Sequence, residues 1–284
     1  MDLTVLQKKR SNSIVEGRVY FCVLGKDITV YEKSTDRSVA CLNGIRYLSS
    51  VRFLSDEVLI IKTTEGIYYR WDIRESKATQ IFKDKRIDPY GQDVCFSCDT
   101  DNAILYDVVQ DRGLRNHILR LDIYTETADF CPVPYEGYVY PWTDFKKNFS
   151  FLQNRFPGKF GPSLVQWNKG QYVTEPIACK AKDKIYFYCA EYVLFQGGDI
   201  LELSTQERHC LGIPEQYTAD MKQGAFFPDR HQLLLICSNS VVVFDLLKNV
   251  VVLSWETPCV FDAKIIGNGL YVCALGGVSR LEIL

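Results

Sequence analysis

The stretch "CSNSVVVFDLLKNVVVLSWE", from Cys237 to Glu256, decides the fold. It is rich in Val and Leu, but Asp245 and Lys248 interrupt it well before the length of about 20 apolar residues that a membrane span needs. No polar face recurs with a period of 3.6 residues, and valine loses side-chain entropy in a helix. We therefore predict the end of one β-strand, a tight turn, a second strand through Phe244, a turn and a third strand.

The same pattern recurs along the chain: an apolar run, a short turn with Gly, Asn or Ser, and a second run that ends in an acid. The clearest copies cover Arg18–Lys33, Glu57–Ile73, Gln232–Leu247 and Gly269–Leu284. The acids are Glu32, Asp72, Asp122, Glu202, Asp245 and Glu282, and the weakest copy carries Gln166 instead. A polar turn and another strand follow each acid, and a further strand precedes most hairpins, so each unit contains four short strands.

Units of four antiparallel strands, spaced by about 40 residues, predict an all-β fold, a β-propeller formed by a single domain over residues 1–284. Seven four-stranded blades are favoured over six. The expected boundaries are 15–44, 45–86, 87–134, 135–178, 179–213, 214–256 and 257–284. The last unit lacks one strand, and we expect the N-terminal strand "DLTVLQ" to supply it and close the ring.

The order of apolar strand, acid, polar turn and apolar strand resembles the repeats of the β-propeller superfamily. The pair Trp71-Asp72 is similar to the signature of WD repeats, but the Gly-His dipeptide of that family is missing. The double glycine of kelch repeats does not recur at a regular position either. The resemblance is thus WD-like or kelch-like in a generic way, covers nearly the whole chain and implies the propeller fold alone.

Composition is that of a globular protein, with 47% apolar and 24% charged residues. The formal net charge of −2 provides no overall attraction to nucleic acid or to an anionic membrane. The N-terminus has its basic cluster after a short apolar run, the reverse of a secretory signal. We expect a cytoplasmic protein with no membrane partner, in which the eleven cysteines are free, with buried thiols among them, and do not form a full disulfide framework.

Four of these cysteines, Cys22, Cys189, Cys237 and Cys273, fall at or near one repeat position, which predicts a packing role. Cys95 and Cys98 form one CxxC pair, but no second ligand pair accompanies it. A metal site at Cys95 and Cys98 with His117 is therefore a minor alternative. We expect no metal and no cofactor.

Catalytic motifs are missing from the sequence: there is no nucleophile elbow, phosphate-binding loop or dinucleotide fingerprint. The pairs Gly197-Gly198 and Gly276-Gly277 are interpreted as hairpin turns. The repeated acids sit at strand ends beside polar turns, where the local backbone can bond them, so a structural role is favoured over a catalytic ring. We expect no enzymatic activity.

Functional residues of a propeller are expected where loops depart from the repeat. The turns between second and third strands are short in blades 1, 2, 6 and 7 but longer in blades 3, 4 and 5: "VQDRGLRNH", "QNRFPGKFGPS" and "EYVLFQGGD". The loops that enter blades 3 and 4 open on the same face and are also long. The candidate partner-binding residues are Arg86, Tyr90, Arg112, Arg115, Tyr135, Tyr138, Tyr140, Trp142, Arg155, Lys159 and Phe160.

Tyr, Trp and Arg are the residues enriched at interface hot spots. The leading hypothesis is therefore a non-catalytic scaffold that binds another protein or a peptide through the loop face of blades 3–5. The alternative is that some of these aromatic residues fill the core of a poorly patterned blade 4. A second hypothesis is binding of single-stranded nucleic acid by the same aromatic and basic residues. A propeller enzyme or small-ligand binder with an axial pocket ranks below both.

Overall fold

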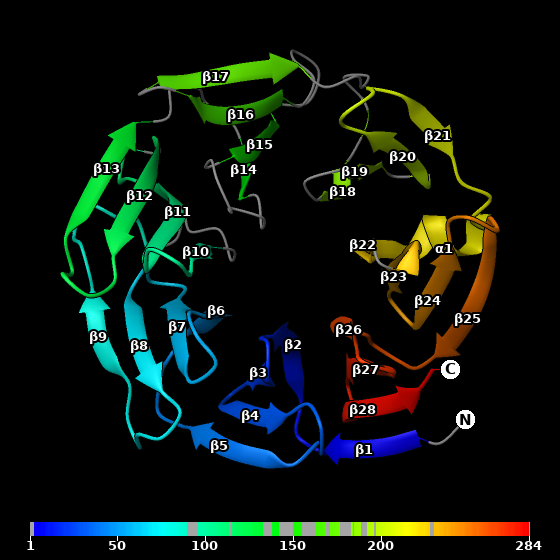
Figure 1. Ribbon diagram of the computed structural model, residues 1–284, viewed down its shortest axis with the longest axis horizontal. Helices are drawn as coiled ribbons and strands as arrows, with labels where there is room; N and C mark the ends of the chain where they lie inside the picture. The colour runs from blue at the N-terminus through cyan, green and yellow to red at the C-terminus, as the bar shows by residue number, and fades with distance from the viewer. Residues whose placement is uncertain are drawn as a thin grey trace.

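The structure is a computed structural model that describes residues 3–89, 96–113, 115–132, 138–141, 150–154, 163–168, 171–176, 183, 185–188, 192–195, 197–227 and 230–283. Figure 1 shows these segments arranged as a ring of sheets around a central axis. In the described part of the chain, the strands form seven four-stranded antiparallel sheets. The prediction of an all-β propeller with four-stranded blades is confirmed.

Within each blade the strands follow one another from the axis to the rim. Blade 1 contains β2 (Ser11–Glu16), β3 (Tyr20–Gly25), β4 (Ile28–Glu32) and β5 (Ser38–Leu42). Blade 2 contains β6 (Leu48–Phe53), β7 (Val58–Thr63), β8 (Tyr68–Asp72) and β9 (Thr79–Phe82). Blade 3 contains β10 (Ser97–Asp99), β11 (Ile104–Gln110), β12 (Asn116–Asp122) and β13 (Ala128–Pro132).

The second half of the chain repeats this order. Blade 4 contains β14 (Tyr138–Pro141), β15 (Ser150–Asn154), β16 (Ser163–Asn168) and β17 (Gln171–Pro176). Blade 5 contains β18 (Ile185–Tyr188), β19 (Tyr192–Phe195), β20 (Asp199–Glu202) and β21 (Arg208–Cys210). Blade 6 contains β22 (Met221–Phe227), β23 (Gln232–Cys237), β24 (Ser240–Asp245) and β25 (Val250–Glu256). The last sheet contains β26 (Asp262–Ile266), β27 (Gly269–Ala274), β28 (Gly277–Glu282) and β1 (Leu3–Gln7).

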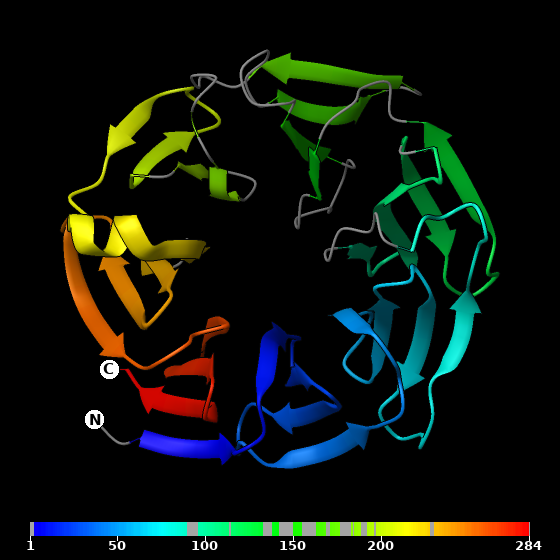
Figure 2. The ribbon, with the colours of Figure 1, turned by 180° about the vertical axis from the view of Figure 1, so that it is seen from behind.

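The opening stretch, Cys237 to Glu256, has the conformation predicted for it: the end of β23, then β24 and β25. One short helix, α1 (Glu215–Asp220), occurs among the described residues, in the connection between blades 5 and 6. No helix in that part of the chain combines the length and the apolar character needed to cross a membrane. Figure 2 shows α1 toward the viewer, on the face where the connections between blades open, which we call the loop face.

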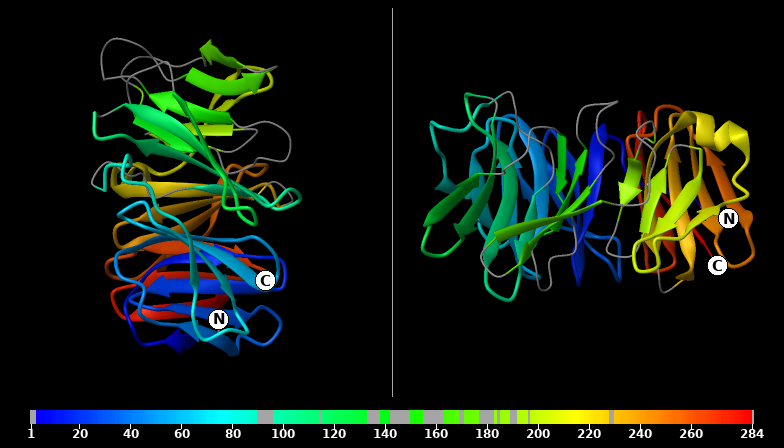
Figure 3. Two further views of the ribbon diagram at one scale, coloured as in Figure 1. Left: turned by 90° about the vertical axis from the view of Figure 1, so that its left-hand side faces the viewer. Right: turned by 90° about the horizontal axis from the view of Figure 1, so that it is seen from above.

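The hydrophobic core is divided among the interfaces between neighbouring blades. One cluster joins blades 1 and 2, with Cys22 and Leu59 among its members, and another joins blades 2 and 3 through Ile60 and Leu105. Both faces of a middle strand are therefore buried, and β7 and β23 each contain five consecutive buried residues. Figure 3 shows the resulting disc edge-on, with the blades packed face to face.

The two ends of the chain meet in the last sheet. β1 pairs with β28 in antiparallel register, with Leu3 opposite Leu281 and Thr4 opposite Arg280. Gly277, at the start of β28, has φ of 120°, and a Cβ atom there would collide with the carbonyl of Gln7. Glycine is thus required where β1 approaches most closely.

Further contacts hold blade 1 against the last sheet. The backbone N–H of Ile14 and the hydroxyl of Ser13 donate to the buried carboxylate of Asp262 at 2.7 and 3.0 Å. Tyr271 donates to Asp36 at 2.6 Å, and its ring lies 4.9 Å from that of Phe21. The interface between the first and last blades therefore contains both hydrogen bonds and packed aromatic rings.

A buried ion pair joins blades 2 and 3. The Lys62 Nζ atom on β7 lies 2.7 Å from Asp107 Oδ2 on β11, and both side chains are 0% exposed. The Tyr68 hydroxyl donates to the same oxygen at 2.5 Å, and burial raises the pKa of Tyr68 well above its usual value. The sequence gives no indication of this network, because Lys62 lies in the apolar run "VLIIKT" and no local pattern identifies its partner.

Three sequence predictions need correction. Blade 1 begins at Ser11, earlier than the predicted residue 15. In blade 5 the predicted long turn "EYVLFQGGD" contains a strand, β19, because Val193, Leu194 and Phe195 are buried on both faces of the sheet. The turn that follows is the predicted glycine hairpin, in which Gly197 and Gly198 have φ of 100° and 87°.

The third correction concerns the cysteines. In the blades of Cys22, Cys237 and Cys273, the repeated acid on the third strand pairs with a residue on the second strand, and positions can be counted from that residue. Cys22, Cys237 and Cys273 lie two, five and four residues after it, so they do not share one repeat position. All three are nonetheless buried, and burial raises the pKa of each thiol. Their packing role is confirmed. Cys189 lies outside the described residues.

Deleting residues 1–8 removes the outer strand of the last sheet. Because β1 contributes backbone hydrogen bonds and covers Val278 and Leu281, we expect the free energy of unfolding to fall by at least about 2 kcal/mol. Urea denaturation would measure this loss. The matched control replaces Leu3 and Val5, which are 57% and 52% exposed, by Thr and should change stability little. Equal stability of the deleted and full-length chains would contradict a structural role for β1.

Replacing Lys62 by Met leaves the buried charge of Asp107 uncompensated, so we expect a loss of about 3–5 kcal/mol. The double variant Lys62→Met/Asp107→Leu removes both charges and should cost less than the sum of the two single changes. Urea denaturation of the four proteins gives the coupling energy directly. A coupling energy near zero would show that the two charges do not interact in the folded state.

Candidate functional site on the loop face of blade 3

The candidate site lies where the connection from β9 to β10 crosses the turn between β11 and β12. Ile87 forms an isolated antiparallel bridge with Asp111, and the backbone N–H of Asp88 donates to the carbonyl of Gln110 at 2.8 Å. These contacts hold the connection against blade 3. A pocket of about 540 Å³ opens between the connection and the turn, and we call it the blade-3 pocket.

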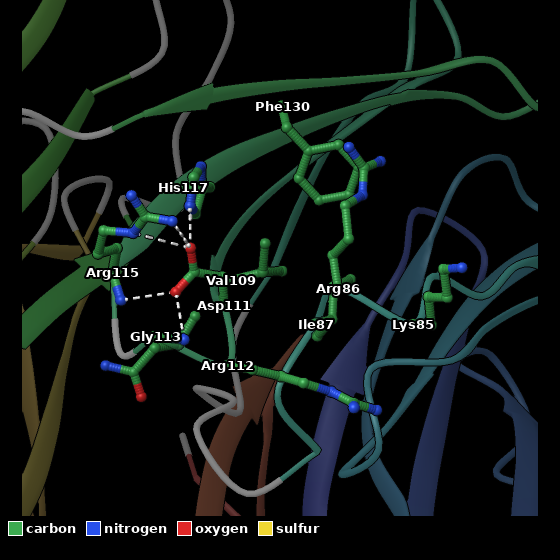
Figure 4. Close-up of a pocket in the computed structure, with 11 residues that line it drawn as sticks. Lys85, Arg86, Ile87, Val109, Asp111, Arg112, Gly113, Arg115, His117 and Phe130 are labelled. Carbon is green, nitrogen blue, oxygen red and sulfur yellow. Dashed lines mark hydrogen bonds and ion pairs between the residues drawn. The ribbon is translucent and has the colours of Figure 1, made fainter.

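The inner wall of the blade-3 pocket is apolar. Ile87 and Val109 are 4% and 1% exposed, and the ring of Phe130 on β13 adds a half-buried aromatic surface. Four basic residues surround this wall: Lys85, Arg86, Arg112 and Arg115 (Figure 4). An apolar wall with a few charged groups at its margin is typical of a binding site.

Asp111 organises one side of the pocket. Its Oδ1 atom accepts hydrogen bonds from the backbone N–H groups of Gly113 and Arg115 at 2.8 and 2.9 Å. Its Oδ2 atom accepts from the Arg115 guanidinium at 3.1 Å and lies 3.0 Å from His117 Nε2. The backbone bond from Arg115 and then the contact with His117 hold the pKa of Asp111 well below its usual range.

Arg86 is held in a similar way on the other side. Asp84 accepts from the Arg86 backbone N–H at 2.8 Å and from its guanidinium at 2.6 and 3.0 Å, and the pKa of Asp84 is lowered chiefly by that side chain. The guanidinium carbon lies 4.1 Å from the centre of the Phe130 ring, within cation–π distance. Both arginines thus have a local acidic partner that favours one orientation of the side chain.

Lys85 and Arg112 differ from these two arginines. Both are exposed, and neither has an acidic partner within the described ranges. Figure 4 shows both side chains extending away from the Asp111 cluster, on the side of the pocket nearer to Ile87. The positive charge that remains uncompensated in the pocket therefore lies there.

His117 supports the turn and has no ring nitrogen available at the pocket. Its Nε2 atom is engaged by Asp111, and its Nδ1 atom is buried with no hydrogen-bond partner among the described residues. A general base needs one nitrogen within reach of a reacting group. The described residues that line the pocket also include no Ser, Thr or Cys that could serve as a nucleophile.

Three of the residues predicted for partner binding, Arg86, Arg112 and Arg115, come together in this pocket, and all three are exposed. Tyr138 and Tyr140 lie on β14, the first strand of blade 4. Tyr90, Tyr135, Trp142, Arg155, Lys159 and Phe160 lie outside the described residues, and so does Cys95 of the minor metal alternative. Blade 5 does not supply the long turn expected of it, because β19 occupies that stretch.

Four residues that build the pocket were not among the predicted site residues: Asp111, Phe130, Ile87 and Val109. His117 was considered only as a metal ligand. The pair Asp111 and Gly113 does carry a local signal, since an acid two residues before Gly is typical of a turn in which the side chain bonds the backbone. Phe130 carries none, because only strand pairing brings β13 beside the connection that contains Arg86.

A second cavity, of about 600 Å³, has a similar construction on blade 2. The loop that enters this blade carries Arg46 and the 65% exposed Tyr47, and the Tyr47 carbonyl accepts from the backbone N–H of Thr64 at 2.8 Å. Glu65 in the adjacent turn contributes a negative charge to this cavity. In both blade 2 and blade 3, the loop that enters the blade is bonded to the turn between the second and third strands. The charged residues that line the two cavities differ.

Three of the repeated acids, Asp72, Asp122 and Asp245, bond the backbone of their own turns, as predicted. Asp72 accepts from the backbone N–H of Arg74 at 3.0 Å, Asp122 from that of Thr125 at 2.9 Å and Asp245 from that of Lys248 at 2.9 Å. The Arg74 side chain lowers the pKa of Asp72 to about 2. In the described part of the chain, no group of three or more His, Cys, Asp or Glu side chains is placed to hold a metal ion.

No protein-family model matches this chain, and no curated protein matches its sequence. The WD-like or kelch-like resemblance is therefore supported only at the level of the propeller fold.

The depressed pKa of Asp111 predicts a pH-dependent effect of Asp111→Asn. A carboxylate whose folded-state pKa lies below its unfolded value of about 3.9 stabilises the protein above that value, and the contribution declines as the pH falls below it. We expect the variant to lose on the order of 1 kcal/mol near pH 7, with a smaller loss below about pH 4. Urea denaturation at several pH values would measure both.

The matched control is Asp101→Asn, which changes an exposed acid on the same blade. It should leave stability nearly unchanged across the pH range. A deficit of Asp111→Asn that stays constant from pH 7 to pH 3 would argue against the ionised Asp111 carboxylate as the group that holds the turn.

Proposed function

We propose that this protein is a non-catalytic interaction scaffold that binds a peptide or a partner subunit on its loop face, with the blade-3 pocket as the anchoring point. The observation that carries the proposal is the pocket itself: an apolar wall of Ile87, Val109 and Phe130 surrounded by Lys85, Arg86, Arg112 and Arg115. Arginine and aromatic residues in a concave setting are typical of interface hot spots.

Preorganisation supports this role. Arg86 and Arg115 are held by Asp84 and Asp111, so a partner that contacts them does not have to order two flexible side chains. The pocket also rests on a stiff support, because Val109 and Phe130 belong to strands whose sheet packs against blade 2. We expect the affinity of such a scaffold to depend more on the low entropic cost of binding to a rigid pocket than on the size of the buried interface.

The framework of the proposal is a seven-bladed ring closed by β1. The pairing of β1 with β28 and the seam around Asp262 favour this arrangement. We further propose a cytoplasmic location, which is supported by eight free cysteines among the described residues, three of them buried.

The test is affinity purification from the cells that express the protein, with recovery measured by quantitative mass spectrometry. The variant Arg86→Ala/Arg112→Ala removes two cationic contacts at the pocket, and we expect at least one partner to be recovered about tenfold less well, a change of about 1.4 kcal/mol. The matched control, Lys26→Ala/Arg37→Ala, removes two exposed cationic side chains from blade 1 and should retain that partner.

The result is meaningful only if the variants are folded, which thermal denaturation would establish. Equal recovery of every partner by the pocket variant and by the control would overturn the assignment of this pocket as the anchoring point.

A further inference from the structure

We infer that the blade-3 pocket takes an acidic peptide segment, in which an aromatic or aliphatic side chain contacts the apolar wall and neighbouring carboxylates pair with Arg112 and Lys85. This inference rests on the proposed function and specifies the chemistry of the partner. It follows from a comparison of the basic residues that form an ion pair with an acid of the same chain and those that do not.

The apolar wall selects for an apolar side chain. Ile87 and Val109 are buried core positions that form the floor of the pocket, so the accessible apolar surface comes mainly from the half-buried Phe130, whose ring Arg86 covers on one face. Covering such surface stabilises a complex by about 25 cal/mol per Å². A volume of about 540 Å³ is enough for one large side chain with its backbone.

The charge balance selects for a carboxylate beside that side chain. Four basic residues line the pocket, and two acids, Asp84 and Asp111, compensate Arg86 and Arg115. Arg112 and Lys85 form no ion pair within the described ranges, so direct contact with an acid does not neutralise their charges. An arginine guanidinium binds a carboxylate through two parallel hydrogen bonds, which makes Arg112 the stronger contact.

Single-stranded nucleic acid fits this arrangement less well than an acidic peptide. Base stacking needs an open aromatic face, and the Arg86 guanidinium lies over the Phe130 ring at 4.1 Å. A nucleic acid strand also needs basic residues along its path, whereas Arg86 and Arg115 are paired internally. The overall charge of −2 provides no long-range attraction to compensate.

The test uses fluorescence anisotropy with three labelled peptides and the full-length protein. The acidic probe is Gly-Ser-Gly-Asp-Glu-Phe-Asp-Glu-Gly-Ser-Gly. One comparison probe replaces its acids by Asn and Gln, and the other replaces its Phe by Ala. We expect the acidic probe to bind about tenfold or more tightly than either comparison probe, and its affinity to fall as salt is added.

Charge-reversal variants locate the binding. Arg112→Glu/Lys85→Glu should weaken binding of the acidic probe by about tenfold or more, because it replaces attraction by repulsion at the unpaired charges. The matched control is Lys26→Glu, in the corresponding turn of blade 1 on the same face, and it should bind within about twofold of the unmodified protein. These positions are exposed, and thermal denaturation would verify that the variants are folded.

The outcomes separate this inference from the proposed function. If the Asn and Gln probe binds as well as the acidic one, or if no probe binds while partner recovery still depends on Arg86 and Arg112, the acidic specificity is wrong and the scaffold role stands. If a labelled 12-nucleotide oligo(dT) binds more tightly than every peptide and is lost in the Arg112→Glu/Lys85→Glu variant, both the inference and the protein-binding role are overturned.

Discussion

The middle strands whose side chains the structure describes are apolar on both faces, and the fold depends on the need to cover both. A strand such as β23, with five consecutive buried residues, can be covered only if another sheet packs on each side. Flat stacking would leave two outer sheets with an uncovered face. A circular arrangement reduces that problem, since a blade within it has a neighbour on each face, and the clusters among the described residues accordingly lie between blades rather than within them.

Burial on both faces makes any polar residue in a middle or inner strand dependent on the next blade. Lys62 faces blade 3 and is compensated by Asp107, while Asp262 faces blade 1 and accepts bonds from Ser13 and Ile14. Such groups are costly to bury alone, so they favour one particular packing of adjacent sheets. They also stiffen the support behind the blade-3 pocket, because Asp107 lies on the same strand as Val109.

The same constraint explains where binding residues can occur. Framework strands are committed to packing, so variation is confined to the outer strands, the turns and the connections between blades. On blade 3 the turn is built around Asp111 and the connection around Asp84, and each acid holds one arginine of the pocket. The arginines that are held in place define the shape of the pocket, and the exposed Arg112 and Lys85 provide its uncompensated charge.

The sequence by itself determined the repeat, the four-stranded units, the acid at the end of most third strands and the glycine turns. These follow from local chemistry: alternation of apolar strands and turns, and side chains that bond their own backbone. It also singled out Arg86, Arg112 and Arg115 as departures from the repeat. What only the tertiary structure decided are the relations between residues distant in the chain. Strand register determines whether Cys237 faces the preceding blade or the next one, and a shift of one residue reverses it. Likewise, the Lys62–Asp107 pair and the contact of Arg86 with Phe130 exist only because segments distant in the sequence lie next to each other in the fold. The local sequence around these residues does not predict those contacts.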